Sequence, residues 1–218
     1  MASAAAGFKT AFLQLAVNHG VLKFGEFKLK SGRLSPYFFN LGLISSGDAL
    51  RELGRAYAQA LVASGTGYDM LFGPAYKGIP LVAAVSIALA EQGINVPFAY
   101  NRKEPKDHGE GGLLVGSAPK GRVVIVDDVL TAGTALRESV AQLRAAGARP
   151  VAALIALDRQ EVGPNGVSTV TELEREQELR VVSLVNLDDV LAFLAGGRGD
   201  PATLEAMRGY RARYGVPA

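Results

Sequence analysis

The chain has 218 residues, of which 49% are hydrophobic and 20% charged, as in an ordinary globular domain and unlike a disordered segment. Its formal net charge is only +2, so no overall field favours nucleic acid as a partner. The absence of cysteine excludes disulfides, thiolate metal sites and a cysteine nucleophile, and fits a reducing cytoplasm.

No segment indicates export or membrane insertion. Residues 1–7 are small and uncharged, without the basic region and long apolar core of a secretory signal. No apolar run approaches the roughly 20 residues that a membrane span needs. We therefore expect a cytoplasmic protein that binds neither membrane nor nucleic acid.

The first hundred residues predict alternating helices and extended segments. In chain order these are a helix over 8–18, an extended and turn-rich stretch over 22–43, a helix from an N-cap at Asp48 to about 64, a strand over 70–72, a helix over 80–92 and a strand over 96–100. The helix over 80–92 is apolar on nearly every side, which predicts that it is packed inside the protein.

The second half continues this alternation after a polar, glycine-rich loop over 101–116. The predicted elements are a strand over 123–126, a helix from about 134 to 147, a strand over 151–157, a helix over 171–178, a strand over 180–185, and helices over 186–195 and 200–214. Asp200 followed by Pro201 is typical of an N-cap with proline at the first helical position. This order predicts an α/β protein with a mostly parallel sheet, and no domain linker is visible.

An apolar run that ends in two acids and a loop of small residues is the strongest chemical pattern in the chain. Residues 123–135 read VVIVDDVLTAGTA. The first four residues predict a strand buried on both faces of a parallel sheet. The small side chains from Thr131 to Thr134 let backbone N–H groups approach an anion, and the following helix aims its positive N-terminus at the same place. The pattern predicts a phosphate site.

The adjacent acids Asp127 and Asp128 would repel a phosphate unless they contact hydroxyls or a cation. Carboxylates accept hydrogen bonds from a diol and suit Mg²⁺, so a sugar phosphate with this metal is the predicted ligand. The alternative is an acidic strand end that only caps a helix. Neither a P-loop motif nor a Gly-x-Gly-x-x-Gly motif occurs, which argues against the nucleotide sites that use them.

Residues 123–135 resemble the phosphoribosyl diphosphate signature of the type I phosphoribosyltransferases, and four further segments resemble the bacterial orotate phosphoribosyltransferases of that family. In family order these are KSGR at 30–33 with SPYFFN at 35–40, GPAYKGIP at 73–80, RKEPKDHGEG at 102–111, and Asp158-Arg159. The resemblance implies the type I phosphoribosyltransferase fold in a single domain over 1–218. Its core would span about 48–160, with a central sheet of about five strands and helices on both faces. Residues 1–47 and part of 161–218 would form a small hood.

The resemblance also implies an activity. The chain would be a glycosyltransferase that moves the 5-phosphoribosyl group from 5-phospho-α-D-ribose 1-diphosphate to orotate. Orotidine 5′-phosphate and diphosphate would be the products, as in the de novo synthesis of UMP. Asp127 and Asp128 would hold the ribose diol, and Mg²⁺ would be carried by the donor's diphosphate and diol, with no protein ligand assigned. The donor site would extend over Val129, Leu130, Thr131, Ala132, Gly133, Thr134 and Ala135.

Positive side chains near the glycine-rich loop suit a departing diphosphate. They are Lys77, Arg102, Lys103, Lys106 and His108. Any one of them alone is equally well explained as a solvated surface charge. The resemblance implies that backbone N–H groups of 75–78, including Tyr76, bind the diphosphate. It also implies a homodimer whose loop 101–116 closes over the neighbouring subunit's site, so that Lys106 and His108 act in trans. Arg102, Lys106 and His108 would join Asp127 and Asp128 as catalytic residues.

The acceptor side is predicted from four further residues. The guanidinium of Arg159 could bind the orotate carboxylate in a bidentate manner, and Lys30 could add a second positive charge. Phe38 and Phe39 would form a wall for the ring, although an aromatic pair taken alone is more typical of core packing. No strong general base is evident, because His19 and His108 are the only imidazoles. Catalysis is therefore expected from charge placement and loop closure.

Three other functions share parts of this pattern. A transferase acting on a purine would keep residues 127–134 without needing Lys30 and Arg159 to bind a carboxylate. A non-catalytic regulator that senses the same sugar diphosphate would carry a DNA-binding module or a broad basic face, and the sequence shows neither. A generic nucleotide-binding or flavodoxin-like protein fits the fold class but not the acids followed directly by small loop residues.

Overall fold

The central sheet of the protein has six strands within the described residues. The computed structural model describes residues 2–29, 32–106, 112–163 and 165–217, with the backbone alone at 2–6, 105–106 and 112. The sheet order is β5–β4–β3–β6–β7–β8, parallel throughout except for the pairing of β5 with β4. The strands are β3 (Met70–Gly73), β4 (Phe98–Lys106), β5 (Gly112–Gly116), β6 (Arg122–Val126), β7 (Arg149–Asp158) and β8 (Arg180–Asn186). The predicted α/β class is confirmed, with one strand more than the expected five.

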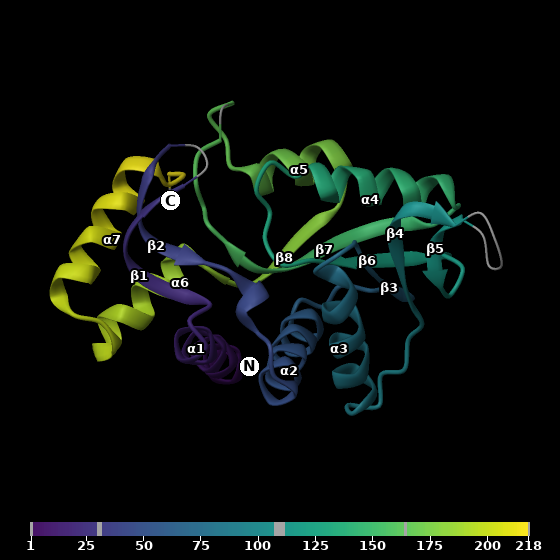
Figure 1. The fold of residues 1–218 in the computed structure, drawn as a ribbon, viewed down its shortest axis with the longest axis horizontal. Coiled ribbons are helices and arrows are strands. Elements are labelled where there is room, and N and C mark those ends of the chain that lie inside the picture. The colour runs from purple at the N-terminus through teal and green to yellow at the C-terminus, as the bar shows by residue number, and fades with distance from the viewer. Residues whose placement is uncertain (1, 30–31, 107–111, 164, 218) are drawn as a thin grey trace.

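Helices cover both faces of this sheet (Figure 1). On one face lie α4 (Thr134–Ala145) and α5 (Thr169–Gln177), and on the other α1 (Ala2–Asn18), α2 (Gly47–Ala63) and α3 (Gly78–Ala90). Strand β6 serves both layers, because Val123 and Ile125 pack in the cluster with α4 while Val124 and Val126 pack in the cluster with α2 and α3. This strand is therefore buried on both faces, as the sequence predicts.

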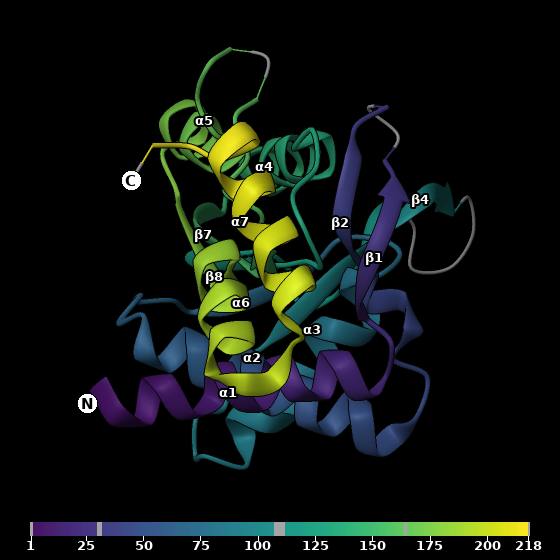
Figure 2. The same cartoon turned by 90° about the vertical axis from the view of Figure 1, so that its left-hand side faces the viewer.

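A two-stranded antiparallel ribbon stands apart from the sheet. It consists of β1 (Leu22–Lys28) and β2 (Leu34–Phe39), in the segment predicted to be extended, and a short 3₁₀ turn (Leu41–Leu43) follows it. Strand β2 packs against the last helix, α7 (Pro201–Tyr214), which follows α6 (Leu187–Phe193) and a π-type turn (Leu194–Arg198). Figure 2 shows α6 and α7 beside α1 and the ribbon, so both ends of the chain contribute to this part of the molecule.

Two helix features differ from the sequence-based expectation. The N-cap of α2 is Ser46, whose hydroxyl accepts a hydrogen bond from the N–H of Ala49 at 3.3 Å, whereas Asp48 lies inside the first turn. Both residue types favour caps, so local sequence did not decide between them. Helix α3 is also not packed on every side, since Ile87 is 64% exposed. Asp200 does cap α7 with Pro201 at its start, as predicted.

The stretch predicted as a loop over 101–116 is largely a hairpin arm. Strand β4 continues to Lys106, and β5 pairs with it from Gly112 to Gly116. Residues 107–111 lie outside the described residues. From Asn101 onward β4 is polar and lacks the apolar alternation on which strand prediction depends. Strand β5 is a short apolar run between two glycines, and its Leu114 packs against the core cluster that contains α4.

Candidate functional site

The segments singled out by the sequence meet at the carboxyl edge of the parallel strands. The N–H of Asp127 donates to the carbonyl of Leu154 at 3.0 Å, and that of Ala156 donates to the carbonyl of Asp128 at 2.8 Å. These bonds attach the acidic pair to β7 just before Asp158 and Arg159. Ligands of open α/β sheets bind at this edge, so the site lies where the fold places ligands.

The two acids differ in their surroundings. The Asp128 side chain is only 12% exposed, and its carboxylate accepts from the N–H of Val129 at 2.8 Å and from Lys77 Nζ at 2.5 Å. Asp127 accepts from the N–H of Asp128 at 2.9 Å, and its backbone carbonyl accepts from the Tyr57 hydroxyl at 2.9 Å. Burial raises the pKa of Tyr57, which therefore remains a protonated donor. The Tyr57 hydroxyl, which comes from helix α2, therefore helps to fix the acidic loop.

Burial together with the charge of Asp128 raises the pKa of Asp127 from 3.8 to about 7. The backbone N–H of Asp128 and the Lys77 ammonium oppose this shift without cancelling it. Ionisation of Asp127 is unfavourable in the free protein. A ligand that supplies hydroxyl donors or a cation would stabilise the ionised form. The acidic pair is thus suited to a diol.

The loop after the acids has the open backbone that an anion needs. Gly133 adopts φ 74° directly before α4, and a Cβ there would lie 2.7 Å from the Leu173 side chain. Thr131, Ala132, Thr134 and Ala135 are exposed, whereas Val129 and Leu130 pack against the two core clusters. The side chains of Val129 and Leu130 are therefore turned to the core, and these residues would act on a ligand through their backbone. Arg137 braces the loop by donating to the carbonyl of Ala132 at 2.6 Å.

The turn from β3 to α3 brings Tyr76 and Lys77 to the same edge. Their side chains are exposed, and the peptide bond between Ala75 and Tyr76 is cis. Of the four N–H groups predicted to bind a diphosphate, that of Ala75 donates to Asn101 Oδ1 at 2.7 Å and that of Gly78 to the Pro74 carbonyl at 2.9 Å. The predicted diphosphate contacts are therefore limited to the N–H groups of Tyr76 and Lys77.

The base of the arm stands beside this turn. Lys103 Nζ lies 5.1 Å from the centre of the Tyr76 ring, and Arg102 and Lys103 line a cavity of about 240 Å³ together with Pro74 and Ala75. Lys30 and His108 lie outside the described residues, and Lys106 is described by its backbone on β4. The structure thus brings Lys77, Arg102 and Lys103 to one region and leaves the roles of Lys30, Lys106 and His108 as predictions.

The aromatic pair on β2 is divided by the strand's alternation. Phe38 is 38% exposed and packs on Phe27 with ring centres 5.6 Å apart, while Phe39 packs toward the core beside Phe12. Tyr37, which the sequence did not single out, is fully buried behind them, and burial raises its pKa. Phe38 is the better placed of the two for contact with a ligand.

Arg159 projects from the end of β7 onto this strand. Its guanidinium lies 4.5 Å from the centre of the Tyr37 ring, and its Nε donates to Glu161 at 2.7 Å. The side chain is 20% exposed. Sequence reasoning missed Glu161, Tyr37 and Asn101, because each acts through a partner distant in the chain and none belongs to a periodic pattern.

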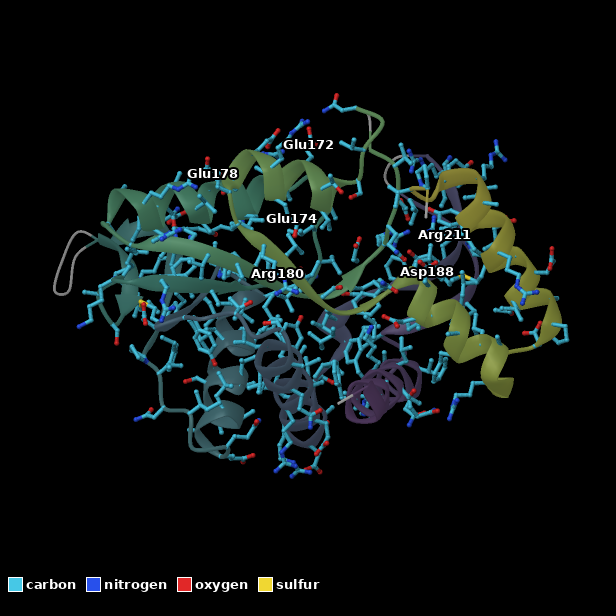
Figure 3. All side chains as sticks on the ribbon, turned by 180° about the vertical axis from the view of Figure 1, so that it is seen from behind. Glu172, Glu174, Glu178, Arg180, Asp188 and Arg211 are labelled. Carbon is cyan, nitrogen blue, oxygen red and sulfur yellow. The ribbon has the colours of Figure 1, made fainter. Side chains whose placement is uncertain are left out.

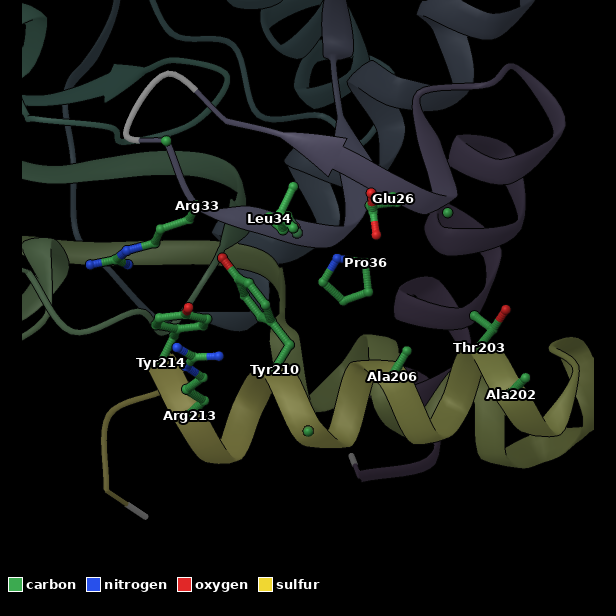
Figure 4. Close-up of a pocket in the computed structure, with 14 residues that line it drawn as sticks. Glu26, Arg33, Leu34, Pro36, Ala202, Thr203, Ala206, Tyr210, Arg213 and Tyr214 are labelled. Carbon is green, nitrogen blue, oxygen red and sulfur yellow. The ribbon is translucent and has the colours of Figure 1, made fainter.

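A second hollow lies away from the acidic motif. This groove of about 780 Å³ runs between the β1–β2 ribbon and α7, and Arg33, Tyr210, Arg213 and Tyr214 are among its lining residues (Figure 4). Its walls contain neither paired acids nor an anion loop, so we place the chemistry at the carboxyl edge of the sheet.

The structure contains no preformed cluster for a metal among its described residues, where no group of three or more His, Asp or Glu side chains converges. The donor set present is the adjacent carboxylate pair, whose hard oxygens fit a magnesium ion shared with a diol and a diphosphate. Within the described chain, every helix is too short or too polar to cross a bilayer.

Comparison with known proteins shows the family of the chain. The family model of the phosphoribosyl transferase domain matches residues 44–184. Orotate phosphoribosyltransferases from Thioalkalivibrio sulfidiphilus and Chromobacterium violaceum are each 56% identical to this chain, covering 96% of it and 99% and 98% of their own lengths. The crystal structure of orotate phosphoribosyltransferase from Francisella tularensis superposes with a TM-score of 0.85 at 39% identity, covering 94% of this chain and 99% of that one. The chain therefore belongs to the phosphoribosyltransferase family and, within it, to the orotate phosphoribosyltransferases.

Proposed function

We infer that the protein transfers the 5-phosphoribosyl group of 5-phospho-α-D-ribose 1-diphosphate to orotate, giving orotidine 5′-phosphate and diphosphate. In the cell this reaction belongs to pyrimidine biosynthesis, as the names of its relatives imply. The observation that carries the inference is the acidic pair Asp127–Asp128 beside the open Gly133 loop, with Arg159 at the end of the adjoining strand.

The donor would be held through its two hydrophilic ends. Asp127 and Asp128 accept hydrogen bonds from the ribose hydroxyls, and the exposed loop from Thr131 to Ala135 surrounds the 5′-phosphate. In the free protein Lys77 already pairs with Asp128. A bound diphosphate offers Lys77 a stronger anionic partner, so the donor would release Asp128 for the diol.

Departure of the diphosphate is the step that needs positive charge. Lys77, Arg102 and Lys103 stand at that end of the site, and we propose that Lys106 and His108 join them from the arm. Bound Mg²⁺ would supply further positive charge to the diphosphate oxygens, with Asp127 and Asp128 as the nearby carboxylates. The ribose carbon becomes cationic as its bond to the diphosphate breaks, and the acidic pair on the diol side offsets that charge.

The acceptor would approach from the hood. We propose that Arg159 binds the orotate carboxylate, that Phe38 covers the ring and that Lys30 contributes a second positive charge. No residue is assigned as a strong base, because the ring nitrogen of orotate is readily deprotonated and can lose its proton to water or to the departing diphosphate. Catalysis then rests on charge placement and closure of the arm.

We also propose that the working unit is a homodimer whose arm, residues 101–116, closes over the partner's site. The arm extends from the sheet edge beyond the core, which suits contact with a second copy. Helix α3 leaves the apolar Ile87 64% exposed, and this side chain lines a groove with Leu50 and Arg51 of α2 and with Glu91. An apolar face of this kind is typical of a surface that is covered in an assembly.

The test of the proposal is turnover with orotate, the sugar diphosphate and Mg²⁺, measured as the loss of orotate absorbance. Arg159→Ala should raise KM for orotate by about tenfold or more and leave KM for the donor nearly unchanged, because it removes a charge-assisted bidentate contact. Arg122→Ala removes an exposed arginine at the opposite edge of the sheet and is the matched control. Loss of donor affinity alone in Arg159→Ala would refute the assignment of this arginine, and wild-type protein without turnover would refute the function.

A further inference from the structure

Glu161 is the centre of a buried polar cluster that joins three distant parts of the chain. Its Oε1 accepts from Arg159 Nε at 2.7 Å and from the Tyr210 hydroxyl at 2.9 Å, and its Oε2 lies 3.5 Å from Arg33 Nη1. The Glu161 side chain is 17% exposed and Tyr210 is 5% exposed. The cluster therefore links the end of β7, the hairpin before β2 and helix α7.

The contact with Glu161 uses one side of the Arg159 guanidinium. Nε donates to Oε1, and Nη2 lies 2.7 Å from the same oxygen but completes no hydrogen bond and is buried. The neighbouring edge, between Nη1 and Nη2, is the edge that a second carboxylate would meet in a bidentate manner. Among the described residues the buried Nη2 has an ion pair with Glu161 but no well-aligned hydrogen bond, and a carboxylate at that edge would give it one.

The remaining surroundings of Arg159 restrict its orientation. Its guanidinium is stacked over Tyr37, whose ring meets Tyr210 edge-on with centres 6.0 Å apart. Glu161 therefore holds the Nε–Nη2 side of the Arg159 guanidinium, and Tyr37 covers one of its faces. Two guanidinium groups, Arg159 and Arg33, share the single carboxylate of Glu161, so the cluster retains one net positive charge for an anionic ligand.

The C-terminal segment keeps Glu161 in place. The N–H of Val162 donates to the carbonyl of Tyr214, and that of Val216 to the carbonyl of Gln160, both at 2.8 Å. Arg211 pairs with Asp188 of α6 at 3.0 Å and thereby fixes the last turns of α7 (Figure 3). Figure 4 shows Tyr210 and Tyr214 projecting from α7 toward the ribbon, where Tyr210 reaches the cluster.

We propose that Glu161 and Tyr210 are positioning residues. They fix Arg159 so that the edge between its Nη1 and Nη2 atoms faces the orotate carboxylate. Helix α7, which has no other assigned chemistry, thereby contributes to the choice of acceptor. This inference rests on the proposed function, because it needs the acceptor carboxylate to meet Arg159.

Steady-state kinetics of three variants test it. Glu161→Ala should raise KM for orotate about tenfold or more, with kcat and KM for the donor changed by less than about threefold. Glu161→Gln keeps an oxygen that accepts from Arg159 and Tyr210, and should restore most of the affinity for orotate. Tyr210→Phe removes only the hydroxyl and should give a smaller rise in the same constant. In an Arg159→Ala background the effect of Glu161→Ala on orotate binding should vanish, since both act through one contact.

Asp69→Ala is the matched control, because Asp69 holds Arg122 through the same Nε and Nη2 side at 3.0 and 2.8 Å, but on the far edge of the sheet. It should lower thermal stability and leave both KM values unchanged. Equal rises of both KM values in Glu161→Ala, no rise at all, or full additivity with Arg159→Ala would each overturn the proposal. Wild-type turnover distinguishes the two failures: if the wild type turns over orotate, such results reject only the role of Glu161, whereas an inactive wild type rejects the proposed function with it.

Discussion

The raised pKa of Asp127 links the proposed role of this residue to the stability of the protein. An unfolded chain releases this proton near pH 3.8, whereas the folded chain holds it to about pH 7. The folded state therefore binds more protons between these values, and the free energy of unfolding falls as pH rises through this window. In the free protein the ionised Asp127 side chain therefore lowers the free energy of unfolding.

Replacing this acid should stabilise the protein in one pH range. We expect Asp127→Asn to increase the free energy of unfolding at pH 8 by about 2–4 kcal/mol and to have little effect near pH 4, because only the ionised group is penalised by burial. Urea unfolding at both pH values measures this, while donor binding should be lost. Asp69→Asn is the control of opposite sign: its pairing with Arg122 lowers the pKa of Asp69 to about 2, so that substitution should destabilise the protein at pH 8. Destabilisation of Asp127→Asn at pH 8 would contradict the burial argument.

At the scale of the elements, the turn from β3 to α3 needs glycine at two positions where no side chain fits. A Cβ on Gly73 would lie 2.2 Å from the carbonyl oxygen of Gly78, and a Cβ on Gly78 would lie 2.5 Å from the Pro74 ring. This close approach sets where Tyr76 and Lys77 emerge at the edge of the sheet. The requirement is one of space, since neither glycine has a positive φ.

Gly78→Ala should therefore reduce the free energy of unfolding by about 2–3 kcal/mol, as expected when a group is forced into packed backbone. Turnover should fall with it, because Lys77 is displaced. Gly47→Ala provides the matched control: Gly47 begins α2, a Cβ there meets nothing within 4 Å, and alanine favours the helix. Thermal unfolding of the two variants decides the point, and similar melting temperatures for both would disprove the steric explanation.

At this scale the sequence was informative where patterns are local. The strand predicted over 123–126 and the helix predicted from about 134 were found, because residues adjacent in the chain define both patterns. The continuation of β4 to Lys106 was not predicted, because its polar residues show no apolar alternation, and β5 was missed because it is only five residues long. The contacts of Glu161 also escaped prediction, since its partners Tyr210 and Arg33 are 49 and 128 residues away. Such contacts depend on tertiary packing and leave no periodic signal.

For the whole molecule, the proposed sharing of the arm can be tested with hybrid dimers. Lys106→Ala damages the arm and Asp128→Asn damages the acidic pair, so each homodimer should be nearly inactive. If the arm acts in trans, random mixing of the two should restore about a quarter of wild-type turnover, because half of the dimers carry one intact site. Turnover after mixing by mild unfolding and refolding measures this. Recovery should be absent when either variant is mixed with itself, and a mixture that stays inactive would show that the arm serves its own subunit.

The backbone pairing of residues 214–216 with 160–162 ties the acceptor side of the site to helix α7. The residues proposed to hold the pentose lie between Asp127 and Ala135, on a different segment of the chain. Recognition of the sugar and choice of the base would therefore depend on separate segments, the second of them supported from behind by α7.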